Sequence, residues 1–403
     1  MRRILFVDDE RRILDGQRML RPCRKQWEMA FATSGSEALA MLDAGPFDMI
    51  VSDMRMPNMD GARLLELVRQ RHPGTIRIML SGQCETEAAL RAVPVAHQFL
   101  SKPCDPEKLR SVIETCFACD SMVTDSATRG VIAGIGELPA LPPTYAALVG
   151  ALDDPKTSLE RVSAIVEGDV AVAAKVLQLV NSAFFGLARE VTAIPTAVAY
   201  LGFDVLKQLV IAVELFRSFP CERPIAGFSV EALHVHSRCV AAIAMCLPVA
   251  APQSAAVSVA ALLHDIGKLV LAVRLPEPFE RALQTSTRDH RPLYSVEEEM
   301  TGTTHAAIGA YVLGLWGLPL AVIDAVSGHH GPLGGPNSEI DLPRAVHIAD
   351  LLAHEAERRL QGPSIAPENS IDFELRDWRE MLPAWRQSAA EIVHRQGTDG
   401  EMW

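Results

Sequence analysis

Positive charge is scarce in this sequence, and the shortage lies entirely in its larger C-terminal part. The chain carries 38 Lys and Arg against 50 Asp and Glu, a formal net charge of −12. Residues 1–120 hold 17 of each sign, so residues 121–403 hold 21 basic and 33 acidic residues. An output region that binds nucleic acid needs a basic face for the phosphates. The composition therefore argues against DNA or RNA as a partner.

The sequence also lacks a disulfide framework and a targeting segment. Its eight cysteines are scattered, and Cys116 and Cys119 form a single CxxC pair, so free thiols are expected rather than a zinc or redox site. The N-terminal MRRILFVDDE is too short in apolar residues for a signal peptide. Residues 239–263 carry no charge, but Pro248 and Pro252 interrupt them, which favours two buried helices over a membrane span. We expect a cytoplasmic protein without a membrane partner.

What the chain does contain is enough apolar material for two or three folded domains. It has 403 residues, of which 49% are hydrophobic and 22% charged, as in ordinary globular proteins. Residues 1–120 alternate a short apolar run with a helix-like stretch five times, whereas Ala- and Leu-rich helical periodicity fills the chain from about residue 144 onward. The pattern predicts an α/β domain of (βα)5 type with a five-stranded parallel sheet, followed by an all-α domain.

Polar side chains follow the predicted strands at the point where each one ends. The expected strands are 4–7, 29–31, 49–51, 76–80 and 97–100, and the expected helices are 13–20, 36–42, 62–71, 85–93 and 106–117. In a parallel sheet the reactive groups collect at the carboxyl ends of the strands. The residues at those ends are Asp8, Asp9, Glu10, Asp53, Ser81, Ser101, Lys102 and Pro103.

These side chains suit phosphoryl transfer to a carboxylate. Three acids at one edge repel one another unless a cation lies among them, and Mg²⁺ prefers carboxylate oxygens and water. Beside a metal ion, an aspartate such as Asp53 can accept a phosphoryl group as a nucleophile. Lys102 would pair with that phosphate and Ser81 would donate a hydrogen bond to it. The alternative is a solvated acidic rim with a helix-capping aspartate.

The motifs VDDE, Asp53 followed by MRMPNMDG, MLSG and FLSKP together resemble the receiver domain of two-component response regulators over residues 1–120. The resemblance implies that Asp53 is the phospho-acceptor and that a histidine kinase is the partner. It implies that Asp8, Asp9, Asp53 and the backbone carbonyl of Arg55 bind Mg²⁺. It also makes Ser81 and Phe99 the switch pair and Lys102 the phosphate contact.

Histidine is concentrated in the second half of the chain. Nine of the twelve histidines fall between residues 234 and 354. Seven residues follow one another on successive predicted helices: His236, His264, Asp265, His305, His329, His330 and Asp350. Imidazole and carboxylate ligands suit Zn, Mn and Fe, and the set is large enough for one or two divalent ions. His234, His290, His347, His354 and His394 lack such neighbours and are expected at the surface or in the core.

The metal interpretation has an alternative for each residue taken singly. His264 and Asp265 could begin a helix, and His329 and His330 could favour a helix end as cations. Lys268, four residues after His264, would lie on the same helical face as His264 and Asp265 and could contact a phosphate beside a metal-bound hydroxide. A buried cluster of this kind without a cation would be costly unless it is wet or internally hydrogen-bonded.

The order of these residues resembles the HD superfamily of metal-dependent phosphohydrolases, including the HD-GYP phosphodiesterases. However, GPLGGP follows His330 in place of the Gly-Tyr-Pro signature. The segment from LPALPPTYAALVGAL to NSAFFG, then IPTAVAYLG, and Glu299 with His305 further on resemble the HDOD module, the HD-related output domain of bacterial signalling proteins. The resemblance covers residues 131–356. Members of that family are regarded as regulatory modules without established enzymatic activity.

Four segments and one main function follow. We expect a receiver at 1–120, a linker at 121–130, an HDOD domain at 131–356 and a partly helical tail at 357–403. The tail would dock on the helical domain through Leu375, Trp378, Met381, Leu382 and Trp385, or else bind a partner or a second copy.

The favoured function is a response regulator phosphorylated on Asp53 that controls an HDOD output acting on a downstream protein. The alternatives are a phosphohydrolase for a substrate such as a cyclic dinucleotide, and a nucleotide-binding module without turnover.

Overall fold

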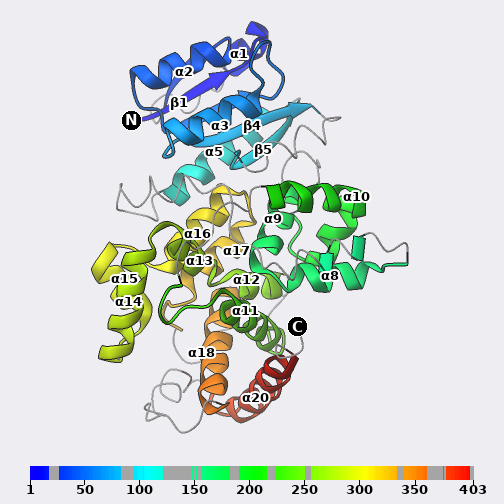
Figure 1. Ribbon diagram of the computed structural model, residues 1–403, viewed down its shortest axis with the longest axis vertical. Helices are drawn as coiled ribbons and strands as arrows, with labels where there is room; N and C mark the ends of the chain where they lie inside the picture. Colours follow the sequence, from blue (N-terminus) through cyan, green and yellow to red (C-terminus); the bar gives the residue numbers. More distant parts are fainter. Residues whose placement is uncertain are drawn as a thin grey trace.

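The protein consists of a sheet-containing domain stacked on a larger helical one, as the computed structural model shows (Figure 1). The structure describes residues 1–17, 27–82, 95–102, 104–120, 147–148, 151–152, 156–181, 190–215, 224–249, 256–333, 340–360, 375 and 378–399. The predicted helix at 85–93 and the predicted linker at 121–130 lie outside these residues.

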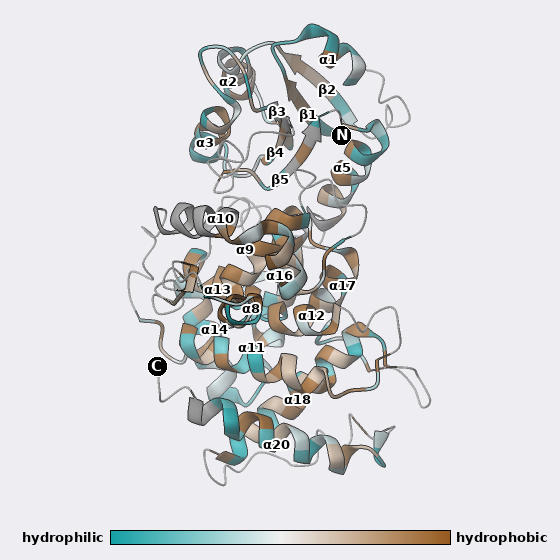
Figure 2. Ribbon diagram, turned by 90° about the vertical axis from the view of Figure 1, so that its right-hand side faces the viewer, coloured by the Kyte–Doolittle hydropathy of each residue, from teal (hydrophilic) through white to brown (hydrophobic). Residues whose placement is uncertain are grey.

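The N-terminal domain is built on the predicted five-stranded parallel sheet. Its strands are β1 (Arg2–Val7), β2 (Trp27–Ala32), β3 (Met49–Asp53), β4 (Ile76–Gly82) and β5 (Gln98–Lys102), in the order β2-β1-β3-β4-β5. Its described helices are α1 (Arg11–Gln17), α2 (Gly35–Ala44), α3 (Gly61–Arg71) and α5 (Pro106–Asp120). Figure 2 shows α2 and α3 on one face of the sheet and α1 and α5 on the other. Every residue of β3 is buried, as expected for a central strand covered on both faces.

The helical domain confirms the predicted all-α region. Its helices are α8 (Leu159–Glu167), α9 (Val170–Asn181), α10 (Ile194–Leu215), α11 (Val230–Ala244), α12 (Val257–Leu263), α13 (Ile266–Arg274), α14 (Pro276–Asp289), α15 (Leu293–Thr301), α16 (His305–Leu315), α17 (Leu320–Gly328), α18 (Leu342–Leu360) and α20 (Leu382–Asp399). Among the described residues, no helix is long and apolar enough to cross a membrane. The uncharged segment 239–263 contributes instead to the buried faces of α11 and α12.

The helix boundaries differ from those expected in places where the chain turns sharply. Apolar periodicity predicts continuous helices over 158–180, 254–273 and 297–316, yet Gly168, His264 with Asp265, and Gly302 each separate two helices. Gly302 adopts a positive φ of 68°, which ends α15 in a left-handed cap. Helix α14 is not among the helices that the sequence predicts, and only Phe279 and Ala282 are buried on it.

A polar junction connects the two domains. The Gln98 side-chain amide at the start of β5 donates to the Gly314 carbonyl of α16 at 3.2 Å, and it also donates to Cys116 Sγ of α5 at 3.3 Å. From the other domain, the Gln178 amide of α9 donates to the His97 carbonyl at 2.9 Å. These bonds are buried, so they fix the two domains in one relative orientation.

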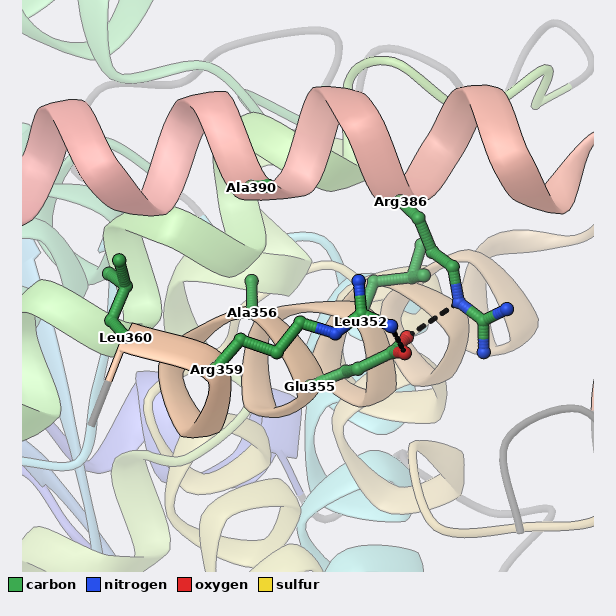
Figure 3. Close-up of a pocket in the computed structure, with 7 residues that line it drawn as sticks. All are labelled: Leu352, Glu355, Ala356, Arg359, Leu360, Arg386 and Ala390. Carbon is green, nitrogen blue, oxygen red and sulfur yellow. Dashed lines mark hydrogen bonds and ion pairs between the residues drawn. The ribbon is translucent and has the colours of Figure 1, made fainter. Parts of the chain in front are cut away.

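The C-terminal helix α20 packs on α18 and α11. Trp378, Leu382 and Trp385 are buried, while Met381 is partly exposed. Arg386 of α20 donates to Glu355 of α18 at 2.8 Å, beside a small pocket of about 90 Å³ between the two helices (Figure 3). The face of α18 that carries Leu352, Glu355 and Ala356 thus supports the tail.

Candidate functional site

Two clusters of chemically active side chains lie in the molecule, and the first is at the carboxyl edge of the sheet. The register pairs Val7 of β1 with Ser52 of β3, which places the next residues, Asp8 and Asp53, side by side. Asp8, Asp9 and Asp53 each have a carboxylate oxygen within 4.8 Å of the others. The structure therefore brings together the three predicted acids, in a group that can hold one cation.

Lys102 at the end of β5 lies between two of these acids. Its Nζ is 2.6 Å from Asp8 Oδ2 and 2.6 Å from Asp53 Oδ1. Burial raises the pKa of Asp53, and the Lys102 ammonium opposes that rise. Burial alone would lower the pKa of Lys102, but hydrogen bonds to Asp53 and Asp8 raise it overall. The lysine therefore stays cationic at the place where an added phosphate would bring negative charge.

The loop after Asp53 is tightly folded around it. Arg55 is exposed two residues later, and Asn58 adopts a left-handed φ of 68°. The chain then returns so closely that a Cβ on Gly61 would lie 2.1 Å from the Asp53 carbonyl oxygen. Only glycine fits at that position, because any side chain would displace the backbone of Asp53.

For the predicted switch residues, Ser81 and Phe99, the structure describes the backbone only. Ser81 of β4 is paired in register with Ser101 of β5, and Phe99 of β5 is paired with Met79 of β4. Phe99 therefore lies in β5, whose Gln98 bonds to α16, and Ser81 lies in the neighbouring strand β4. Their side chains lie outside the part that the structure describes.

The second cluster contains all seven predicted residues of the helical domain. His236 comes from α11, and His264 and Asp265 form the junction between α12 and α13. His305 begins α16, His329 and His330 follow α17, and Asp350 lies on α18. The ligand atoms of His236, His264 and Asp265 lie within 4.8 Å of one another, as do those of His305, His329 and His330. Asp265 connects the two groups, with Oδ1 3.3 Å from His305 Nε2 and Oδ2 3.3 Å from His264 Nε2.

Four of these imidazoles are held by a contact at Nδ1. His264 Nδ1 bonds the Ala261 carbonyl at 2.7 Å, and His329 Nδ1 bonds the Val326 carbonyl at 2.6 Å. The other two rings meet carboxylates, His305 at Glu297 Oε2 (2.6 Å) and His236 at Glu357 Oε1 (2.8 Å). Metal-ligating histidines almost always have such a partner on the second ring nitrogen, because it fixes the tautomer and the ring orientation.

The opposite ring nitrogens face the centre of the cluster. His264 Nε2, His329 Nε2 and Asp265 Oδ1 are buried and make no hydrogen bond. Buried polar atoms without partners cost free energy, and a shared cation would satisfy all three. Nitrogen and carboxylate donors suit Zn, Mn or Fe, with Asp265 positioned to bridge two ions. The donor set therefore fits one or two divalent transition-metal ions.

The electrostatics of the cluster are strongly coupled. Burial alone would lower the pKa of His236 and of His264, but the adjacent carboxylates raise these values to about 10 and about 9. Burial and the neighbouring imidazoles lower the pKa of His329 to about 3. Without a cation, the carboxylates thus hold protons on His236 and His264, whereas burial and the neighbouring imidazoles keep His329 neutral. A divalent cation would take over the charge that those protons supply.

Lys268 does not share one continuous helix with His264, in contrast to the expectation from spacing. The helix breaks at Asp265, which caps α13. Lys268 Nζ nevertheless reaches Asp265 Oδ2 at 2.5 Å across the first turn of α13. The lysine therefore neutralises a predicted ligand directly, and a phosphate contact by Lys268 remains a prediction.

Sequence reasoning missed four residues of this site. Glu297 and Glu357 hold His305 and His236, while Tyr294 stacks on His330 with 4.5 Å between ring centroids. His354 was expected at the surface or in the core, yet its ring stacks on that of His236 at 4.4 Å. The available signal was helical spacing, since His354 and Glu357 follow Asp350 by one and two turns.

The backbones of helices α13 and α16 are in contact beside the cluster. A Cβ on Gly267 would lie 1.9 Å from the His305 carbonyl oxygen. Asp265 precedes Gly267 by two residues, and His305 supplies the carbonyl oxygen in this contact. A side chain at position 267 would therefore push Asp265 away from His305.

Comparison with known families matches both parts of the chain. Residues 4–114 match the response regulator receiver domain, and residues 138–332 match the HDOD domain. Asp350, His354 and Glu357 lie beyond the second of these ranges. The receiver match covers the acidic cluster, and the HDOD match covers the remaining histidines of the second cluster.

Individual relatives share parts of the chain. An uncharacterized protein of Treponema pallidum is 26% identical over 223 residues, 54% of this chain and 42% of its own length. The hydrogenase transcriptional regulatory protein HoxA of Cupriavidus necator is 32% identical over 124 residues, 30% of this chain and 25% of its own. The chain thus spans less than half the length of these curated relatives. A crystal structure of the MmoQ response regulator from Methylococcus capsulatus aligns with 62% of this chain and 98% of its own, at 21% identity and a TM-score of 0.49.

Proposed function

Because this chain belongs to the response regulators in which a receiver domain precedes an HDOD domain, we propose that Asp53 accepts a phosphoryl group from a histidine kinase and thereby controls the HDOD half. The observation that carries the proposal is Lys102, whose Nζ is 2.6 Å from both Asp8 and Asp53. The Lys102 ammonium would form an ion pair with the phosphate of an acyl phosphate on Asp53. The HDOD half then acts on a downstream protein.

The transfer needs a nucleophile, a cation site and a charge partner. An Asp53 oxygen forms the new bond to phosphorus while the bond from phosphorus to the kinase histidine breaks. Asp8, Asp9, Asp53 and the Arg55 carbonyl would hold Mg²⁺, which neutralises charge on the transferred group. Lys102 then holds the phosphate oxygens in place of the Asp53 carboxylate. The buried setting of Asp53, 7% exposed, restricts access by water.

The test is phosphorylation of the full chain by a small-molecule acyl phosphate. We expect an acid-labile phosphoprotein that forms with Mg²⁺ and is lost in Asp53→Asn. The matched control is Asp43→Asn, since Asp43 is an exposed acid of α2 that pairs with His72. Labelling that persists in Asp53→Asn would reject the acceptor.

The second cluster supports a second candidate function, metal-dependent hydrolysis of a phosphoester under receiver control. The observation in its favour is that three buried ligand atoms, on His264, His329 and Asp265, make no hydrogen bond and lie close to one another. His236, His264, Asp265 and Asp350 would hold one ion and His305, His329, His330 and Asp265 a second. A bound ion of this kind supplies a hydroxide nucleophile at neutral pH.

Two measurements separate the candidates. Elemental analysis of the purified chain is expected to find a transition metal that is lost in a double variant, His264→Ala with Asp265→Ala. Turnover of cyclic dinucleotides or of a model phosphodiester by the metal-loaded protein would establish hydrolysis. Metal without turnover would leave the second cluster a structural or regulatory site.

A further inference from the structure

His354 lies on the same face of α18 as Asp350 and Glu357. The three residues are spaced by four and three positions, so their side chains follow one another along one side of the helix. The His354 side chain is 49% exposed, whereas that of Asp350 is 5% exposed. His354 is thus the member of the set that lies between the buried cluster and solvent.

The rings of His354 and His236 are stacked and share the same two carboxylates. Their centroids are 4.4 Å apart and their planes differ by 24°. His236 reaches Asp350 with Nε2 (3.0 Å) and Glu357 with Nδ1 (2.8 Å). His354 repeats the arrangement, with Nε2 3.3 Å from Asp350 Oδ1 and Nδ1 3.4 Å from Glu357 Oε2. The two imidazoles therefore present the same ring nitrogen in the same direction.

That nitrogen lies where a metal ligand would lie. The Nε2 atoms of His236, His354 and His264 are 3.0, 3.3 and 3.7 Å from one oxygen, Asp350 Oδ1. Ligand atoms bonded to one transition metal at about 2.1 Å lie roughly 3–3.4 Å apart. The ligand atoms of His236, Asp350 and His354 also all lie within 4.8 Å of one another. The distances from His236 and His354 to Asp350 Oδ1 fall within that range, and the distance from His264 lies just outside it.

We propose that His354 is a further protein ligand of the ion held by His236, His264, Asp265 and Asp350, and that it fills a coordination position that a hydrolase leaves to water. This inference rests on the proposed metal site. Structural metal sites are closed by protein ligands, whereas catalytic ones keep a position open. With His354 in place, this ion ties α11, α12 and α18 together without exposing a hydroxide to substrate.

The experiment uses the full chain loaded with Co²⁺, whose ligand-field absorption reports the donor atoms. In His354→Ala, water oxygen replaces an imidazole nitrogen, so the bands shift and chelator competition shows about tenfold or greater loss of affinity. Added free imidazole should restore the original spectrum in the variant. His394→Ala, an exposed histidine of α20, is the matched control and should behave as the unchanged protein.

Two other outcomes would overturn the inference about His354, and a third would reject the proposed metal site. Unchanged spectrum and affinity in His354→Ala would overturn the inference and leave the metal site intact. Affinity lost without spectral rescue by imidazole would also overturn it, because His354 would then act by packing. An unchanged chain that takes up no Co²⁺ at the second cluster would reject the proposed metal site itself. Circular dichroism of both variants checks that they are folded.

Discussion

Gln98 donates its side-chain amide to the Gly314 carbonyl across the boundary between the two domains, at 3.2 Å. Gln98 directly precedes Phe99 in β5, and Gly314 lies in the helix that begins with His305. The strand that carries the predicted switch aromatic is therefore bonded to the helix that carries a predicted metal ligand. This junction therefore joins the sheet that carries Asp53 to the helix that begins with His305.

Removing this bond should uncouple the domains. A phosphate mimic on the full chain is expected to change hydrogen exchange in α16, with a coupling of about 1–3 kcal/mol. Gln98→Ala leaves the buried Gly314 carbonyl without that donor, so the change in α16 should shrink or vanish. The control is Gln387→Ala, which removes only an exposed bond to Glu391 within α20. Equal responses in Gln98→Ala and the unchanged protein would show that coupling takes another route.

Gly61→Ala should impair phosphorylation from outside the acidic cluster. The new Cβ would lie 2.1 Å from the Asp53 carbonyl oxygen and 2.9 Å from Met79 Sδ, and overpacking of this kind costs about 1–3 kcal/mol. We expect a lower Tm and slower Mg²⁺-dependent labelling of Asp53. Gly16→Ala on α1, where an added Cβ meets nothing within 4 Å, should lower neither the Tm nor the labelling rate, because alanine favours the helix over glycine. Normal labelling in Gly61→Ala would mean that the loop relaxes without moving Asp53.

Glu297→Gln should weaken metal binding although Glu297 is not itself a proposed ligand. Its Oε2 accepts from both the backbone N–H and the ring of His305, at 2.8 and 2.6 Å. Loss of such a partner typically lowers metal affinity about 10–100-fold. Glu299→Gln provides the comparison, since Glu299 lies on the same helix but is exposed and paired with Arg291. Chelator competition on both variants measures the difference, and identical affinities would contradict the role of Glu297.

The reactivity of Cys239 should report whether α11 is held in place. Burial, together with the charge of Glu357, raises the pKa of this thiol to about 12. The unfolded chain ionises Cys239 near pH 9, so this thiol favours the folded state fully below pH 9 and loses that contribution as the pH rises toward 12. At pH 9 the native protein should alkylate at the exposed Cys246 and spare Cys239.

Metal should slow that reaction further. Cys239 lies one turn after His236, so an ion that joins α11 to α18 suppresses the local opening that exposes the thiol. Peptide-level mass spectrometry of alkylated protein, with and without metal, gives both rates. Metal-independent labelling of Cys239 would indicate that His236 does not hold the ion.

The predictable parts of the two clusters are those governed by local rules. Parallel strands end at one edge, so the acids after 4–7 and 49–51 could be placed together from the sequence. The order of His236, His264 and Asp350 on successive helices likewise predicted that they would meet. Both inferences depend on elements that are recognisable from periodicity.

Contacts between distant segments could not be predicted in the same way. Glu357 meets His236 across 121 residues, and Gln98 meets Gly314 across 216. Helical spacing places Glu357 on the same face of α18 as Asp350, but it does not indicate that His236 is the partner of Glu357. The break at Asp265 was also hidden, because apolar periodicity continues through it while the tight contact of Gly267 with α16 decides the geometry.

The position of Asp350 has a practical consequence for dividing the protein into pieces. The HDOD match ends at residue 332, but Asp350, His354 and Glu357 all come from α18, and α20 packs on that helix. A recombinant fragment cut at the family boundary would keep His264 and discard these three side chains together with the cover over α11 and α12. Such a fragment would lack metal because the proposed ligands on α18 had been removed, even if the full chain binds it. Expression boundaries should therefore extend through residue 399.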